Sequence, residues 1–264
     1  MVNSLAVVAL LLAAWFSLKK QVLTRSAGVA MVIMGSVITF SLGIGALILM
    51  FLFFSTSSML TGRSNRESSQ TRSLIQVLAN GGIPMLAAMG NWIVPHSVWF
   101  IIYIACIGAA NSDTWASEWG KRSSKLPYHW QLGRRVTVGL SGAISLSGTI
   151  ASLLGALFIV CCGVLILPIF PKPTFIWIIL LTLTAWLGQW VDTWLGGFCQ
   201  GRFRCSECGC LTDHDTHCHQ PAVLVHGYGW MTNSMVNSLA SFSSGIAGGG
   251  IYLWFLSMNW VPPF

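Results

Sequence analysis

Long apolar runs alternate with short polar loops along this chain. The runs cover residues 3–18, 27–54, 74–89, 97–119, 138–167, 174–197 and 236–257. A transmembrane helix needs about 20 apolar residues to cross roughly 30 Å of hydrocarbon. The run at 27–54 exceeds one crossing and is interrupted by Gly35, Gly43 and Gly45, so it is either one tilted helix or two short ones. The pattern predicts an all-α, polytopic integral membrane protein with seven or eight transmembrane segments, in one domain over residues 1–264.

Composition and charge agree with this class. Hydrophobic residues make up 54% of the chain and charged residues 8%, whereas a soluble domain carries about 25% charged residues. The net charge of +7 comes from Lys and Arg in the loops, which predicts orientation in a membrane and not binding of nucleic acid. Lys19 and Lys20 follow the first apolar run, so we expect a retained helix and not a signal peptide. Splitting 27–54 also brings this basic pair to the side of the other basic loops, which favours eight segments.

Three acidic residues lie in or at the ends of apolar segments: Asp113, Glu118 and Asp192. Ionisable groups at membrane depth cost several kcal/mol on most scales, so their presence indicates function by default. The alternative is a buried structural pair with Lys or Arg. Two carboxylates that face each other suit Mg²⁺, which proteins hold by one or two carboxylates together with phosphate oxygens of a substrate.

The segments around these acids resemble each other. Asp113-Thr114-Trp115 and Asp192-Thr193-Trp194 are each followed by a basic loop, a Val-rich stretch that ends in Gly, and an Ala-Ser pair in the next apolar run. Either coincidence or duplication of halves 97–167 and 174–257 explains this. If the basic loops and the Cys/His-rich loop are cytoplasmic, both acid-bearing helices run inward, and the halves form a parallel repeat in the cell membrane with the two Asp facing each other.

Several polar residues near these acids have both a functional and a simpler interpretation. The loop after Asp113 carries basic residues that can clamp phosphates or only set topology and attract lipid headgroups: Lys121, Arg122, Arg134 and Arg135. Small residues begin the run at 138–167; they either allow close helix packing or let the backbone approach a phosphate at a helix N-terminus. Gln76 and Asn80 share a helix face, and the following Gly-Gly-Ile-Pro84 is expected to bend or break that helix.

A cysteine-rich loop at 202–220 has the spacing of a zinc knuckle. Cys205-x-x-Cys208-Gly supplies one pair of ligands, and Cys218 with a neighbouring His supplies the other. His217 is the first choice for the fourth ligand; His214, His219 and Cys210 are alternatives. Four protein ligands leave no open position, so the zinc would be structural. A disulfide or free thiols are the competing interpretation.

Ordered blocks over nearly the whole chain resemble one membrane family. They are Ser57-Ser58-Met59-Leu60-Thr61, Gln76-Val77-Leu78-Ala79-Asn80-Gly81, Asp113-Thr114-Trp115-Ala116-Ser117-Glu118-x-Gly120, Ser145-x-x-Gly148-Thr149, Val191-Asp192-x-x-Leu195-Gly196-x-x-x-Gln200 and Asn233-x-x-Val236-Asn237. The family is that of transmembrane protein nineteen and the plastid phytyl-phosphate kinases, also called domain of unknown function ninety-two. Its bacterial members are similar in carrying a Cys-rich insertion after the second Asp.

The resemblance implies a kinase that uses CTP, or another nucleoside triphosphate, to convert an isoprenyl monophosphate to the diphosphate. It implies that Asp113, Glu118 and Asp192 hold the Mg²⁺–nucleotide. It also implies that polar site residues lie in the other blocks: Asn80, Ser145, Thr149, Gln200, Asn233 and Asn237. Thr232 and Ser234 stand where other members tend to have amides or Asp, so the third polar cluster is reduced or the activity differs.

Some alternatives stay open. Glu118 lies about 140° round an ideal helix from Asp113, so it is either a group behind the metal ligands or a partner for the basic loop. Repeats and intramembrane acids are also typical of transporters and lipid-handling proteins. A zinc-stabilised membrane scaffold is the non-enzymatic interpretation.

Overall fold

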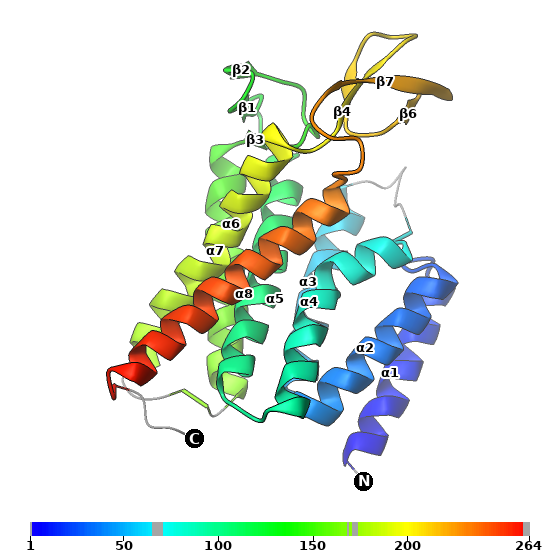
Figure 1. The fold of residues 1–264 in the computed structure, drawn as a ribbon. Coiled ribbons are helices and arrows are strands. Elements are labelled where there is room, and N and C mark those ends of the chain that lie inside the picture. Colours follow the sequence, from blue (N-terminus) through cyan, green and yellow to red (C-terminus); the bar gives the residue numbers. More distant parts are fainter. Residues whose placement is uncertain (1, 65–70, 168, 171–173, 261–264) are drawn as a thin grey trace.

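Eight helices form the body of the computed structural model, which describes residues 2–64, 71–167, 169–170 and 174–260. The helices are α1 (Val2–Lys19), α2 (Arg25–Leu42), α3 (Ile44–Ser64), α4 (Leu74–Ile93), α5 (Val98–Gly120), α6 (Leu146–Ile166), α7 (Thr174–Phe198) and α8 (Asn233–Ser257). Short strands lie together at one end of the helices (Figure 1). They are β1 (Tyr128–His129), β2 (Arg134–Arg135), β3 (Ala143–Ile144), β4 (Arg202–Cys205), β5 (Leu211–Thr212), β6 (Thr216–His217) and β7 (Gln220–His226).

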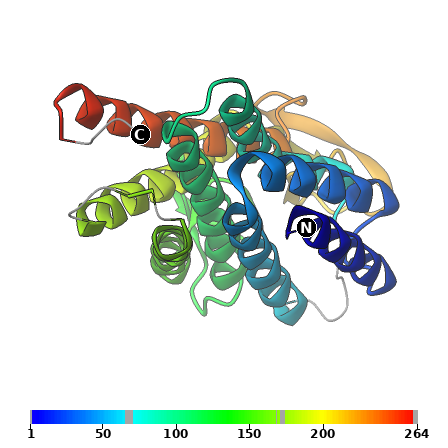
Figure 2. The same ribbon diagram turned by 90° about the horizontal axis from the view of Figure 1, so that it is seen from below.

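Helix α5 is the centre of the bundle. It packs against α3, α4, α6, α7 and α8, and the view along the helices shows it surrounded by them (Figure 2). Its residues 103–112 are all buried, as expected for a helix that is apolar or small on every face. Helix α1 packs on α2 at the edge of the bundle (Figure 1).

The apolar run at 27–54 forms two helices, and the prediction of a helical membrane protein is confirmed. Gly43 has φ +85° and its N–H closes α2 on Thr39 O, a conformation that glycine adopts without steric cost. Among the described residues, five helices, α2, α3, α6, α7 and α8, are long and apolar enough to cross a membrane, and α1 is a shorter apolar helix. Outside this group are α4 and α5, which carry Asn80 and Asp113, two of the polar residues of the candidate site.

Pro84 bends α4 without breaking it. The helix continues from Leu74 to Ile93 with Pro84 inside it, and it changes direction part-way along its length in Figure 1. A proline lacks the N–H for the helical hydrogen bond and its ring presses on the preceding turn, which accounts for the bend. Gln76 has a local role, since its Oε1 accepts the N–H of Ser73 at 2.9 Å to complete a capping box.

The predicted span at 138–167 starts too early. Helix α6 begins at Leu146 because Ser145 caps it, with Oγ accepting the N–H of Gly148 at 3.1 Å. Gly139 and Gly142 have φ of +101° and +83°, which no right-handed helix accommodates. Gly139 and Gly142 therefore belong to a loop that leads into β3, whereas Gly148 and Gly155, further along the run, lie in the contact between α6 and α5.

Two small antiparallel sheets, absent from the all-α prediction, complete the fold. Their strand orders are β2-β1-β3 and β5-β4-β7-β6. Arg202 of β4 joins the sheets, because its Nη1 donates to Gln131 Oε1 and its Nη2 lies 2.8 Å from His129 Nε2. The first sheet follows α5 and the second follows α7 along the chain, so each acid-bearing helix ends in a strand-rich segment.

Candidate functional site

A polar cleft of about 1180 Å³ lies at the end of the bundle that carries the strands. Its walls come from the last turns of α5 and α7, the first turns of α4, α6 and α8, the loop 137–145 and the cap 211–217. Seven residues proposed from the sequence as catalytic or substrate-binding line it: Asp113, Glu118, Lys121, Ser145, Thr149, Asp192 and Asn233. Chain folding thus brings together residues that are up to 120 positions apart (233 − 113).

Asp113 and Asp192 meet in this cleft. Their side chains are in hydrogen-bond contact with each other. The amide nitrogen of Asn237 faces them, donating to Asp192 Oδ2 at 2.8 Å and to Asn233 O at 2.9 Å. Two carboxylates in contact cannot both stay ionised and unpartnered, so the pair must share a proton or bind a cation.

Glu118 is held apart from this pair by its own partner. The side chain is 6% exposed, and its Oε1 accepts from Lys121 Nζ at 2.9 Å. Its Oε2 has no hydrogen-bond partner among the residues that the structure describes. This geometry matches the role of a partner for the basic loop, and it leaves one carboxylate oxygen available in the cleft wall.

Arg72 is a cleft residue that the sequence did not single out. It lines the main cleft and an adjoining cavity of about 100 Å³. Burial lowers the pKa of its guanidinium, whereas the charge of Glu118 raises it. In the sequence Arg72 is one of several loop cations, and neither its spacing nor its neighbours distinguish it.

Three helices begin at the cleft. Ser145 caps α6, Thr232 caps α8 with Oγ1 accepting the N–H of Met235 at 3.4 Å, and Ser73 caps α4. Helix N-termini carry about half a positive charge and free N–H groups, which favour anions. Gly148 allows α6 to approach α5 closely, since a Cβ there would lie 2.9 Å from Ala116 O.

The predicted polar residues of α4 and α8 form the adjoining cavity. Asn80, Asn233 and Asn237 line it together with Arg72 and Gln76. Asn80 Nδ2 donates to Gln76 O at 3.2 Å. Because Asn237 also reaches Asp192, this cavity continues the hydrogen-bonded network of the two acids toward α4.

Four other predicted site residues are not among the described residues that line either cavity. Arg122 donates to Leu60 O at 3.0 Å and stacks on Trp119. Arg134 and Arg135 are exposed in β2, where Arg135 Nη1 donates to Leu126 O at 2.8 Å. Gln200 is buried and its Nε2 donates to Ser141 Oγ at 2.9 Å, so it supports the cleft wall from behind.

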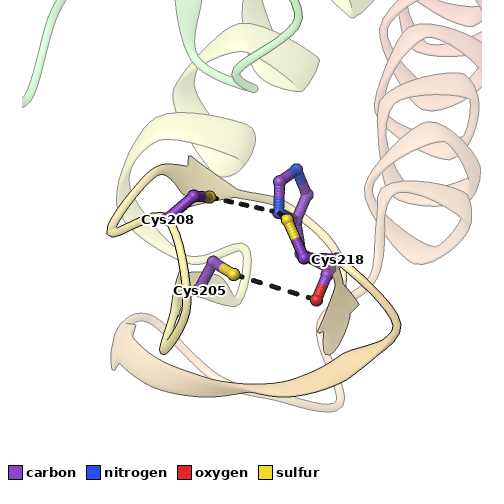
Figure 3. A group of neighbouring side chains, drawn as sticks. Cys205, Cys208 and Cys218 are labelled. Carbon is purple, nitrogen blue, oxygen red and sulfur yellow. Dashed lines mark hydrogen bonds between the residues drawn. The ribbon is translucent and has the colours of Figure 1, made fainter.

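The cysteine-rich loop gathers the four side chains that its spacing predicts. The ligand atoms of Cys205, Cys208, His217 and Cys218 all lie within 4.8 Å of one another, and Figure 3 shows the thiols of Cys205 and Cys208 pointing toward the segment that carries Cys218. Backbone N–H groups, first that of Cys208, lower the pKa of the Cys205 thiol to about 6. Three alternative ligands lie outside this group of four: Cys210, His214 and His219.

Comparison with known proteins places the chain among membrane proteins. The profile of the integral membrane protein family DUF92 matches residues 8–245. An uncharacterized membrane protein of Methanocaldococcus jannaschii is 36% identical over 138 residues, which are 48% of this chain and 56% of that protein. No solved structure gives a significant match. Because the family profile covers most of the chain, this multi-pass membrane protein belongs to the integral membrane protein family DUF92.

Proposed function

We propose that this protein is a membrane-embedded kinase that transfers a phosphoryl group from CTP, or another nucleoside triphosphate, to an isoprenyl monophosphate. The contact between Asp113 and Asp192 in a polar cleft where helices begin is the observation that carries the proposal. The substrate class and the nucleotide rest on the family resemblance of the sequence blocks.

The two acids fit a magnesium site. Their carboxylates supply hard oxygen ligands at one point, and Asn237 fixes the orientation of Asp192 by its 2.8 Å hydrogen bond. When bound, Mg²⁺ neutralises charge on the phosphates between which transfer occurs. A bound cation would also stabilise the two acids, because its charge offsets the repulsion between adjacent carboxylates.

The cleft also carries positive groups for the phosphates. The N-termini of α6 and α8 present backbone N–H groups, while Lys121 and Arg72 add full charges. An oxygen of the isoprenyl phosphate forms the bond to the γ-phosphorus as the bond to the nucleoside diphosphate breaks. No strong general base is needed, since a phosphate monoester is already anionic near pH 7 and catalysis is mostly positioning and charge stabilisation.

The depth of the acids favours an enzyme over a transporter. Asp113 lies seven residues before the end of α5 (120 − 113) and Asp192 six before the end of α7 (198 − 192). At 1.5 Å per residue they are about 10 Å from the helix ends. Transporter sites lie near the bilayer midplane, whereas this depth lets a soluble nucleotide reach the acids while an isoprenyl tail stays in lipid. We accordingly assign the strand-bearing end to the cytoplasm.

A transfer assay tests the proposal. Purified protein is incubated with labelled CTP or ATP, Mg²⁺ and prenyl phosphates of several lengths, and the diphosphate is separated and counted. Asp113→Asn and Asp192→Asn should abolish turnover while the variants keep the wild-type elution profile in detergent. Glu207→Gln is the matched control, because it removes one negative charge from an exposed position. Near-wild-type turnover in either Asp variant would refute the metal-site assignment.

A further inference from the structure

We infer that Cys205, Cys208, His217 and Cys218 bind one structural zinc ion, which fixes the cap 211–217 against the wall of the cleft. This site is separate from the two acids, and the inference does not depend on phosphoryl transfer. Three thiolates and one imidazole are a common ligand set for structural zinc.

The distances suit a tetrahedral ion. With Zn–S near 2.3 Å and Zn–N near 2.0–2.1 Å, tetrahedral geometry places S and N about 3.6 Å apart. His217 Nδ1 lies 3.5 Å from Cys208 Sγ and 3.2 Å from Cys218 Sγ, and all four ligand atoms fall within 4.8 Å of one another. The ion therefore fits after shifts of a few tenths of an ångström, and Nδ1 is the ligating nitrogen.

The backbone around the cluster is built for two thiolates on one ion. Gly209 follows Cys208 with φ +71°, and its N–H donates to Cys205 O at 3.0 Å to close the turn. Cys205 N–H in turn donates to Cys210 O at 3.0 Å. These bonds hold the Cys205 and Cys208 thiols on the same side, facing the β6–β7 hairpin in Figure 3.

The hairpin itself carries strain that a bound ion would offset. Cys218 and His219 join β6 to β7 with φ of +51° and +59°. A left-handed conformation is unfavourable for a residue with a Cβ, and two-residue turns of this kind favour Asn and Gly. Neither Asn nor Gly stands here, and a bond from the Cys218 thiolate to zinc at the apex of the turn would offset the unfavourable backbone conformation.

The cluster is linked to the cleft through the segment that joins β5 to β6. Asp213 lies between β5 and β6, and its Oδ2 accepts the N–H of Ser141 at 2.8 Å. Ser141 belongs to the loop 137–145, which lines the cleft. Asp213 and His217 also line the cleft. Zinc would thus set the position of Asp213, and through Ser141 it would hold the loop that faces the acids.

Metal analysis of the protein tests whether these four side chains bind zinc. Protein purified in mild detergent without chelators should contain about one zinc per chain by inductively coupled plasma mass spectrometry. Cys208→Ser should lose at least about four-fifths of this zinc, because a serine oxygen replaces one thiolate. Cys210→Ser is the matched control, since this neighbouring exposed thiol lies outside the group of four, and it should keep the wild-type content.

A second measurement uses the wild-type protein, so that the zinc site can be tested even if Cys208→Ser fails to fold. Cobalt exchanged into the wild-type protein should give the visible bands of a tetrahedral thiolate site, and a strong chelator should remove them and expose Cys205, Cys208 and Cys218 to alkylation. Less than half an equivalent of zinc in wild-type protein, full zinc in Cys208→Ser, or a disulfide between these thiols in freshly isolated protein would each overturn the inference.

Discussion

Gly142 is the position where one added methyl group tests how the cleft wall is built. Its φ is +83°, and a Cβ at this residue would lie 2.2 Å from Gly197 Cα and 2.6 Å from Gly197 N. Non-bonded carbon atoms prefer separations of about 3.5–4.0 Å. Both colliding atoms belong to the backbone of α7, so the side chain of an alanine cannot turn away, and Gly142→Ala must push the loop off the helix.

The expected loss of stability follows from three contributions. The positive φ costs an alanine about 1–2 kcal/mol. Displacement of the loop breaks the bond from Ser141 N–H to the carboxylate of Asp213, at 2.8 Å, and the bond from Gln200 Nε2 to Ser141 Oγ, at 2.9 Å. Bonds to charged groups contribute about 1.5–3 kcal/mol and neutral ones about 0.5–1.5 kcal/mol. Gly142→Ala should therefore destabilise the protein by roughly 3–6 kcal/mol.

Gly139→Ala is the matched control in the same loop. Gly139 has φ +101°, but a Cβ there would have nothing within 4 Å, so only the conformational cost of about 1–2 kcal/mol applies. The free energy of unfolding is measured for both variants by titrating protein in mild detergent with a denaturing one, following Trp fluorescence. If the two variants differ by less than about 1 kcal/mol, the close approach of this loop to α7 is not a feature of the folded protein.

Three further predictions concern the cleft and the sheets. Asn237→Ala removes the donor to Asp192 Oδ2 and should raise the Mg²⁺ concentration needed for half-maximal phosphoryl transfer about 10–100-fold. An unchanged Mg²⁺ concentration would refute the role of Asn237 in orienting Asp192. Lys121→Met leaves Glu118 Oε1, in a side chain 6% exposed, without its partner, so thermal unfolding should show a loss of stability of about 1–3 kcal/mol that Lys121→Arg restores. A loss that persists in Lys121→Arg argues against the ion pair. Burial and a neighbouring guanidinium lower the pKa of His129 to about 4, whereas the unfolded value is about 6.5. Stability from the neutral ring is complete above about pH 6.5 and is lost as pH falls toward 4, so the unfolding temperature should drop over this window, and His129→Gln should flatten the curve.

The membrane fold was predictable because hydrophobic patterning dominates its energetics. Two helices in the run at 27–54 were favoured by its length and by the basic loops, but its several glycines did not single out Gly43 as the break. The start of α6 was missed, because mean hydropathy does not separate a small-residue loop from a helix. Ser145 carried the missing signal, since Ser followed by Gly148-Thr149 is a capping sequence, and Gly139 and Gly142 precede it.

Two parts of the candidate site could be predicted from the sequence: the charged residues within apolar helices, and the cysteines whose spacing limits which thiols can reach one ion. Asp113 and Asp192 are conspicuous in apolar helices, and Cys205-x-x-Cys208 restricts which thiols can share an ion. Loop cations have neither property. Whether Arg72 enters the cleft while Arg134 stays exposed depends on how the loops fold back over the helix ends, and the local sequence does not encode that path.

The direction of the helices explains why the acids and the helix N-termini lie at the same end. Asp113 and Asp192 are about 10 Å from the ends of α5 and α7. If α7 ran the other way, Asp192 would lie 18 residues (192 − 174), or about 27 Å, from the cleft end, too far to share an ion with Asp113. Parallel α5 and α7 require a single helix that returns the chain between them, which is α6. That helix must begin where α5 ends, and α8 must likewise begin where α7 ends. A pair of acids on parallel helices therefore places two anion-favouring N-termini beside itself, so that one topology would supply both halves of the metal–phosphate site that we propose.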